Sequence, residues 1–223
     1  MQALLDWLLD VIAPRRCLGC DAMGERRFCA DCGEPEAPSS ALELGGVPVI
    51  AVGAYSGALS AAIRRYKYES RPDLAAPLAG LLEEPVARFA ALRPTLVPVP
   101  LSAARLCERG FNQAALLARA WARPCRGRVE PRLLARVRQT RQQARLGRRE
   151  RRENMADAFV VRARHVPSSV VLVDDVVTTG ATAEACIRAL RDRGSHVLAV
   201  FALARAERGA IVDRAGANPR AYP

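Results

Sequence analysis

Apolar and polar residues follow one another along the chain in a pattern that predicts short buried strands separated by helices. The strand-like segments are short, almost purely apolar runs, at 47–55, 95–99, 170–173 and 196–203. The helix-like segments repeat apolar residues three and four positions apart, at 57–66, 74–92, 105–122 and 182–193. Strands that are apolar on both faces and alternate with helices are typical of a largely parallel sheet flanked by helices. The sequence therefore predicts an α/β fold.

Two segments near the N-terminus do not follow this alternation. Apolar residues within 1–12 have helical spacing, which predicts an amphipathic helix that ends at Pro14 and packs on the rest of the protein. Residues 33–46 are rich in proline, serine, glycine and glutamate, which predicts a linker. We therefore expect a small N-terminal unit over 1–36 and a main domain over 47–223.

Composition and charge restrict the function classes. Half of the residues are apolar and 26% are charged, as in globular proteins, and no apolar run approaches the roughly 20 residues of a membrane helix. We expect no membrane insertion and no export signal, so the chain is predicted to be cytoplasmic with reduced cysteines. The net charge of +11 is concentrated in residues 101–165, which contain 17 arginines against five acidic residues. Lysine occurs once, at Lys67.

Four of the seven cysteines form two CxxC pairs, at Cys17, Cys20, Cys29 and Cys32. Two such pairs are the ligand set of a tetrahedral zinc site, and Gly19 and Gly33 give the turns the backbone freedom that they need. Because thiolates fill all four positions, the Zn²⁺ is predicted to be structural rather than catalytic. The metal would supply folding energy that so short a segment cannot obtain from a core of its own.

The segment VVLVDDVVTTGAT at 170–182 carries the most chemical information. A buried strand ends in two adjacent carboxylates, Asp174 and Asp175, and a loop of small and hydroxyl-bearing residues leads into a helix. Such a loop presents N–H groups to a phosphate, and Gly180 can adopt a positive φ there at little cost. The carboxylates would repel a phosphate, so we expect them to accept hydrogen bonds from ribose hydroxyls. A plain strand–turn–helix with capping acids is the simpler alternative, but capping needs only one acid and no TTGAT.

This segment resembles the signature of type I phosphoribosyltransferases, which bind phosphoribosyl pyrophosphate (PRPP). Further motifs resemble the ComF family, namely VPVPL at 97–101, RLCERGFNQ at 105–113, QTRQQARL at 139–146 and RRERREN at 148–154. The four-cysteine segment and the Tyr66-Lys67-Tyr68 sequence fit the same family. The chain is therefore identified as a member of the ComF family, which is associated with DNA uptake in natural competence and combines a zinc finger with a PRPP-binding domain. The resemblance implies a type I phosphoribosyltransferase-like fold.

The resemblance also implies a role for each residue of the loop. Asp174 and Asp175 would bind the ribose hydroxyls and form the catalytic centre. The 5′-phosphate would lie against the loop residues, which are Thr178, Thr179, Gly180, Ala181 and Thr182. Residues 97–100 match the strand end that opens the pyrophosphate loop. In related amidophosphoribosyltransferases that loop continues Asp-Ser-Gly, whereas here it continues Leu101-Ser102-Ala103, so only part of the motif carries over.

Basic residues near these motifs are candidates to contact the pyrophosphate group or to act in a lid, namely Arg105, Arg109, Lys67 and Arg145. A solvated helix face is the alternative for Arg105 and Arg109. For Lys67 the alternatives are a contact with the acceptor and a surface lysine. Residues 136–152 contain eight arginines and no aromatic residue. Their position resembles the mobile loop that closes over PRPP, where cations would stabilise the leaving pyrophosphate, and Mg²⁺ would bind with PRPP. A contact with a nucleic-acid backbone and a plain charged helix are the open alternatives.

Three functions are compatible with these features. The first is phosphoribosyl transfer from PRPP to an unidentified acceptor. The second is a non-catalytic competence module that binds PRPP or single-stranded DNA. The third is a zinc-stabilised adaptor for a DNA-uptake helicase. The retained paired aspartates and TTGAT loop favour PRPP binding, whereas the arginine-rich segment allows a contact with DNA.

Overall fold

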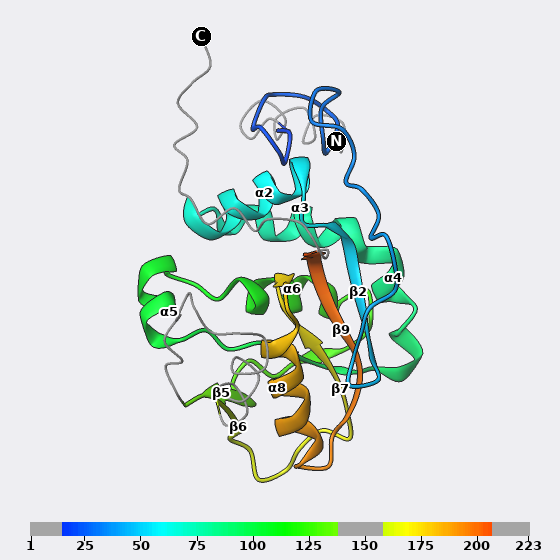
Figure 1. Cartoon of the computed structure of the whole chain (residues 1–223), viewed down its shortest axis with the longest axis vertical. Helices are drawn as coiled ribbons and strands as arrows, with labels where there is room; N and C mark the ends of the chain where they lie inside the picture. Colours follow the sequence, from blue (N-terminus) through cyan, green and yellow to red (C-terminus); the bar gives the residue numbers. More distant parts are fainter. Residues whose placement is uncertain (1–14, 138–157, 207–223) are drawn as a thin grey trace, which may run out of the picture.

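A mostly parallel sheet forms the centre of the protein, with helices on both faces (Figure 1). The computed structural model describes residues 15–137 and 158–206. The strands of the sheet are β1 (Glu43–Leu44), β2 (Val47–Ala54), β3 (Thr95–Pro98), β4 (Arg128–Val129), β7 (Ser169–Val173), β8 (Val176–Val177) and β9 (His196–Arg205). Within the described residues their order is β1-β2-β9-β7-β3-β4, with β8 beside β9. Adjacent strands are parallel, except that β1 and β2 are antiparallel.

Helices connect the strands and lie on both sides of the sheet. In chain order they are α2 (Gly57–Tyr68), α3 (Ala75–Ala79), α4 (Glu83–Ala87), α5 (Ala103–Arg109), α6 (Gln113–Ala122) and α8 (Ala181–Arg191). Residues of α2, α3 and α6 share one hydrophobic core with one face of the sheet, and α8 shares another core with the opposite face. A separate antiparallel pair, β5 (Leu134–Arg136) and β6 (Phe159–Val161), also contributes to the core of α8.

Alternate residues of the central strands enter these two cores. On β7, Val171 and Val173 face the core of α2, α3 and α6, whereas Val170 and Leu172 face the core of α8. All four side chains are fully buried. Because successive strand residues point to opposite faces, an all-apolar strand needs cover on both sides. The predicted α/β architecture with a largely parallel sheet is therefore confirmed.

The single helix predicted over 74–92 is wrong, because prolines divide the segment. It contains α3 and α4 together with short 3₁₀ turns at Pro72–Leu74, Gly80–Leu82 and Ala90–Leu92. Pro77 and Pro85 lie in the first turns of α3 and α4. A proline lacks the N–H that a helix interior requires, but the first turn has no partner for that N–H in any case. Each proline is therefore tolerated at the start of a short helix, and residues 74–92 form two short helices in place of one long one.

The continuous helix predicted over 105–122 is also interrupted. α5 ends at Gly110, whose φ of 75° is left-handed and whose N–H donates to the carbonyl oxygen of Leu106 at 2.9 Å. α6 then begins after Asn112, whose Oδ1 accepts a hydrogen bond from the N–H of Ala115 at 3.3 Å. A left-handed glycine after one helix and an asparagine cap before the next are ordinary boundary signals. The predicted helix is therefore two helices, and Arg105 and Arg109 lie on the first of them, α5.

The predicted linker over 33–46 contains an edge strand of the sheet. β1 pairs with β2 through a turn formed by Gly45 and Gly46, whose φ angles are 59° and 75°. Two glycines between apolar residues are a hairpin signal, since both central positions of such a turn need a positive φ. Leu44 of β1 is only 4% exposed. Because residues 33–46 have the composition of a linker, Leu44 was not predicted to be a core residue.

Two sequence predictions lie outside the described residues. They are the amphipathic helix over 1–12 and the greater part of the arginine-rich segment, namely its residues 138–152. In the described part of the chain, none of the helices combines the length and the apolar character needed to cross a membrane.

Candidate functional site

The predicted site residues lie where β7 and β3 end side by side. The N–H of Val99 donates to the carbonyl oxygen of Val173 at 2.8 Å, so residues 97–100 run next to the start of the Asp174-Asp175 pair. β3 leads towards α6 on one face of the sheet, whereas β7 leads into α8 on the other. In open α/β sheets, ligands bind at the carboxyl ends of neighbouring strands whose connections leave on opposite faces.

Asp174 and Asp175 follow β7 directly and are fixed by main-chain hydrogen bonds. The N–H of Asp174 donates to the carbonyl oxygen of Phe201 at 2.9 Å, and the carbonyl oxygen of Asp175 accepts from the N–H of Leu203 at 3.0 Å. The N–H of Asp175 donates to Oδ1 of Asp174 at 2.8 Å. Burial and the neighbouring charge of Asp175 raise the pKa of Asp174 to about 7, although the charge of Lys67 acts in the opposite direction. Asp174 can therefore gain or lose a proton near neutral pH.

The single lysine of the chain reaches this pair from α2. Nζ of Lys67 lies 2.8 Å from Oδ1 of Asp175, and the two side chains are only 13% and 11% exposed. Water and salt screen such a pair much less than an ion pair on the open surface. The sequence suggested a phosphate contact, a contact with the acceptor or a surface lysine, and the structure places Lys67 against one of the two carboxylates.

The loop after the carboxylates carries the predicted phosphate-binding residues. Gly180 precedes α8 with a φ of 78°, and the N–H of Ala181 donates to Oγ1 of Thr179 at 3.4 Å. A cavity of about 30 Å³ opens here and is lined by Asp174, Val176, Val177, Thr178, Gly180, Ala181, Thr182 and Ala183. The first N–H groups of a helix have no partner within that helix and favour an anion. The loop and the first turn of α8 therefore have the geometry that favours an anion beside Asp174, as the sequence predicts.

Leu44, which was not predicted as a site residue from the sequence, packs against this loop at Gly180. A Cβ atom on Gly180 would collide with Cδ2 of Leu44, the buried residue of β1. Glycine is thus required at position 180 for two reasons, the positive φ and the contact with Leu44. The Gly45-Gly46 hairpin signal could have revealed Leu44 as a core residue.

Arg105 brings positive charge towards Asp174, and Arg136 lies close enough to Arg105 for their charges to interact. Arg105 is exposed on α5, and its charge opposes the rise in the pKa of Asp174. Arg136 ends β5, where burial and then the charge of Arg105 lower its pKa. Its guanidinium also lies 5.7 Å from the ring centre of Phe159. Arg105 was named individually from the sequence as a candidate to contact pyrophosphate. Arg136 was predicted only as one of the eight arginines of residues 136–152.

Arg109 faces the interior rather than an open site. Its side chain is buried, and its guanidinium lies 5.1 Å from the ring centre of Tyr68. Nη1 of Arg109 donates to Oε1 of Gln113 at 3.2 Å. The structure thus joins Arg109 to the end of α2 and the start of α6. The remaining candidate, Arg145, lies outside the described residues.

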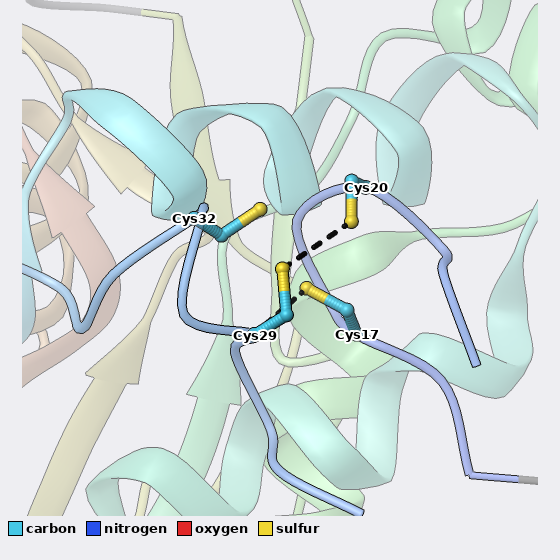
Figure 2. Close-up of side chains that lie close together, drawn as sticks. All are labelled: Cys17, Cys20, Cys29 and Cys32. Carbon is cyan, nitrogen blue, oxygen red and sulfur yellow. Dashed lines mark hydrogen bonds between the residues drawn. The ribbon is translucent and has the colours of Figure 1, made fainter. Parts of the chain in front are cut away.

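The four predicted zinc ligands form a second site (Figure 2). Their sulfur atoms all lie within 4.8 Å of one another, and Sγ of Cys20 and Sγ of Cys29 are 3.7 Å apart. A tetrahedral zinc ion with four bonds of about 2.3 Å places its sulfur ligands roughly 3.8 Å apart. Figure 2 shows the four side chains pointing towards a common centre. The arrangement therefore fits a structural zinc ion bound by Cys17, Cys20, Cys29 and Cys32.

Backbone hydrogen bonds prepare one of these thiols for the metal. Burial raises the pKa of Cys17, but the N–H groups of Cys20, Cys29 and Gly19 outweigh burial and lower it to about 6. The N–H of Cys29 lies 3.3 Å from Sγ of Cys17. Burial and the neighbouring cysteines raise the pKa of Cys32. A metal ion displaces the thiol protons and offsets the repulsion between adjacent thiolates.

The two glycines of the cysteine segment act in different ways. Gly33 has the predicted positive φ, at 68°. Gly19 is required instead because a Cβ atom there would lie 2.9 Å from Sγ of Cys32. Residues 15–33, which we call the zinc knuckle, also add buried Leu18 and Phe28 to the core of α2, α3 and α6. The zinc knuckle is therefore packed onto the sheet domain through α2.

Comparisons with known proteins give the family of the chain. No protein-family model matches it. It is 34% identical over 162 residues to the DNA utilization protein YhgH of Salmonella typhi, covering 70% of this chain and 71% of that protein. It is 34% identical over 166 residues to competence protein F of Haemophilus influenzae, covering 71% and 72%. It is 27% identical over 199 residues to competence protein ComFC of Streptococcus pneumoniae, covering 85% and 87%. The chain therefore belongs to the ComF family.

Proposed function

We propose that the protein binds PRPP at the end of β7, in a domain of the type I phosphoribosyltransferase kind. The observation that carries the proposal is that Asp174 and Asp175 lie directly beside the loop of small and hydroxyl-bearing residues that leads into α8. Two carboxylates next to a phosphate position suit a sugar phosphate, because the hydroxyls of the sugar can donate to the acids while N–H groups bind the phosphate.

Each part of PRPP then has its own group of residues. The 5′-phosphate lies against residues 178–182, and the ribose hydroxyls donate to Asp174 and Asp175. The pyrophosphate lies beside residues 97–103, within reach of the positive charges of Arg105 and Arg136. Oxygen-rich ligands of this kind bind Mg²⁺ through their own phosphate oxygens and water, so a protein cage for the ion is not required.

The chemical step that we propose is transfer of the phosphoribosyl group to an acceptor that is still to be identified. The bond between C1 of the ribose and the pyrophosphate oxygen breaks, and the new bond forms between C1 and the acceptor. Negative charge develops on the departing pyrophosphate, and Arg105 and Arg136 are placed to stabilise it. The sequence Leu101-Ser102-Ala103 differs from that of the amidophosphoribosyltransferases, so binding without turnover is the alternative.

We further propose that the protein acts in the cytoplasm in the uptake or use of DNA. Two relatives are named competence proteins and one a DNA utilization protein.

A pocket of about 400 Å³ between the zinc knuckle and α3 supports a contact with single-stranded DNA, because its lining includes Arg15, Arg16, Arg26, Arg27 and Arg71. Asp21, Glu25 and Asp73 also line it. A backbone contact here would weaken steeply with salt, whereas an adaptor for a DNA-uptake helicase would bind that protein without DNA.

Calorimetric titration with PRPP and Mg²⁺, combined with an assay of released pyrophosphate, tests the proposal. We expect one PRPP to bind per chain, and binding to be lost in the Asp174→Asn/Asp175→Asn variant. The matched control is Asp192→Asn, which removes an exposed carboxylate after α8. Release of pyrophosphate without an added acceptor would support hydrolysis of PRPP. Binding without release would support either a PRPP-sensing module or a transferase whose acceptor is missing, which a screen of nucleobases and DNA would separate. Absence of binding, or equal binding by the double variant, would overturn the proposal.

A further inference from the structure

The ion pair between Lys67 of α2 and Asp175 after β7 places a positive charge against one of two adjacent carboxylates. Nζ of Lys67 lies 2.8 Å from Oδ1 of Asp175, and both side chains are nearly buried. Among the described residues, Oδ2 of Asp175 takes part in no hydrogen bond or ion pair. The lysine thus occupies one oxygen of the carboxylate and leaves the other available as an acceptor.

The position of Lys67 is well defined because its neighbours on α2 are anchored on both sides. Tyr66 is fully buried, and its hydroxyl donates to the carbonyl oxygen of Gln113 at 2.9 Å. Tyr68 packs under the guanidinium of Arg109. Lys67 between them therefore reaches Asp175 from a fixed backbone, which reduces the entropy lost when the pair forms.

Other charged and titratable groups face the two carboxylates from the surrounding elements. Tyr55 at the end of β2 has a pKa raised by burial, lowered in part by Lys67 and raised further by Asp175. Arg105 of α5 acts on Asp174, and Cys186 of α8 has a raised pKa to which burial and then the charge of Asp174 contribute. Of these groups, only Lys67 forms an ion pair with Asp175 among the described residues.

Without a cation at this position, two adjacent carboxylates in a poorly solvated site tend to share a proton. A protonated carboxyl group donates one hydrogen bond and accepts more weakly, whereas a ribose hydroxyl needs an acceptor for its own proton. The positive charge of Lys67 lies against Asp175 and so offsets the repulsion between the two carboxylates at the position that receives a ribose hydroxyl.

We propose that Lys67 is a positioning residue for ribose recognition, holding the carboxylate of Asp175 oriented so that Oδ2 accepts a hydrogen bond from a ribose hydroxyl. This inference rests on the proposed function and adds to it, because Lys67 then acts through Asp175 rather than on a phosphate. It predicts that Lys67 discriminates ligands that contain ribose from ligands that contain phosphate alone.

The test compares ribose 5-phosphate with inorganic phosphate, followed by the NMR shifts of the backbone amides of residues 178–182. In Lys67→Met we expect affinity for ribose 5-phosphate to fall about tenfold or more, while affinity for inorganic phosphate stays within about twofold. Lys67→Arg keeps the charge and should recover most of the lost affinity. Arg64→Met, which removes one charge from the same helix, should leave both affinities unchanged.

Several outcomes would overturn the inference. Lys67→Met could bind both ligands as the wild type does, or it could lose affinity for both equally, which would indicate a phosphate contact or a purely structural role. If Lys67→Met does not fold, Lys67→Gln keeps a hydrogen-bond donor without the charge and allows the same comparison. Loss of discrimination in Arg64→Met would also count against a specific role for Lys67.

The same titrations separate this inference from the proposed function. If the wild type binds neither ribose 5-phosphate nor PRPP better than inorganic phosphate, the PRPP site itself is wrong. If the wild type prefers the ribose-containing ligands and Lys67→Met keeps that preference, the PRPP site stands and the role of Lys67 is wrong.

Discussion

Nη2 of Arg65 lies 2.6 Å from Oδ1 of Asp21, and this ion pair joins α2 to the zinc knuckle. Nη1 of Arg65 also donates to the carbonyl oxygen of Leu18 at 3.2 Å. The Arg65 side chain is only 11% exposed, so solvent screens the contact less than a surface ion pair. Because α2 also carries Lys67, one helix connects the cysteine site with the paired aspartates. The zinc knuckle therefore supports the helix that serves the candidate PRPP site.

The first prediction concerns loss of zinc. Cys17→Ser removes one ligand, and we expect it to release the metal and lower the melting temperature of the whole protein by about 10 °C. The reason is that Leu18 and Phe28 of the zinc knuckle belong to the core shared with α2. Metal content by atomic absorption and melting by circular dichroism would measure the two effects.

Cys107→Ser is the matched control, because Cys107 is exposed on α5 and lies outside the four-cysteine cluster. It should keep both the metal and the melting temperature. A Cys17→Ser protein that retained one zinc ion per chain would show that the ligands are assigned incorrectly. One that lost the metal but melted like the wild type would show that the zinc knuckle does not support the core.

The sheet could be predicted from the sequence because its strands are almost purely apolar. The run at 170–173 allows few readings other than a strand covered on both faces, and the structure confirms it. The helices were harder, since helical spacing continues through breaks that depend on single residues. Pro77, Pro85 and Gly110 decide where those helices end, and their effect depends on which turn of a helix they occupy.

In the candidate site, too, the sequence predicts features that lie within one short segment but not contacts between distant segments. Adjacent carboxylates and a loop of small residues can be read from spacing, because both parts lie in one short segment. The contact between Lys67 and Asp175 cannot, since it joins residues more than a hundred positions apart through the pairing of β2 with β9 and of β9 with β7. The rarity of lysine and the resemblance of Tyr66-Lys67-Tyr68 to the family marked Lys67 in advance, but neither indicated its partner.

The second prediction concerns Asp174 and the pH dependence of stability. Its pKa is raised to about 7 in the folded protein by burial and the charge of Asp175. In the unfolded chain it is near 3.9. As pH rises between these values, the unfolded chain releases this proton first, so the residue increasingly destabilises the native state. Above about pH 7 the destabilisation is complete and constant.

Asp174→Asn should therefore raise the free energy of unfolding at pH 8 and change it much less at pH 4. Asparagine keeps an Oδ1 atom that can accept the hydrogen bond from the N–H of Asp175. Urea unfolding at several pH values measures the difference, with the exposed Asp192→Asn as the control. If Asp174→Asn were less stable at pH 8 than at pH 4 relative to the wild type, the ionised carboxylate would contribute stability and the proposed sign would be wrong.

The third prediction concerns the fit of the zinc site. Gly19→Ala would place a Cβ atom 2.9 Å from Sγ of Cys32, so that this ligand must shift. We expect the affinity for zinc to fall by roughly tenfold, as it does when groups around metal ligands are changed. Competition with a chromophoric chelator measures this affinity. Gly24→Ala is the control, because its Cβ atom would meet nothing within 4 Å, and equal affinities in the two variants would contradict the prediction.

The fourth prediction concerns the contact between the phosphate loop and β1. Gly180→Ala should lower the free energy of unfolding by about 2–4 kcal/mol, because alanine is strained at a positive φ and its Cβ atom would collide with Leu44. Gly194→Ala separates the two causes, since Gly194 has a φ of 84° but open space around it. Its cost should be only about 1 kcal/mol.

The double variant Gly180→Ala/Leu44→Ala provides the decisive comparison. Leu44→Ala alone should cost about 2–5 kcal/mol, as for other buried leucines. In the double variant the alanine at position 180 no longer meets the leucine side chain, so the combined loss should be smaller than the sum of the two single losses. Strict additivity in urea unfolding would mean that Leu44 does not support the loop. A combined loss smaller than that sum would show that β1 supports the loop that we propose to bind phosphate.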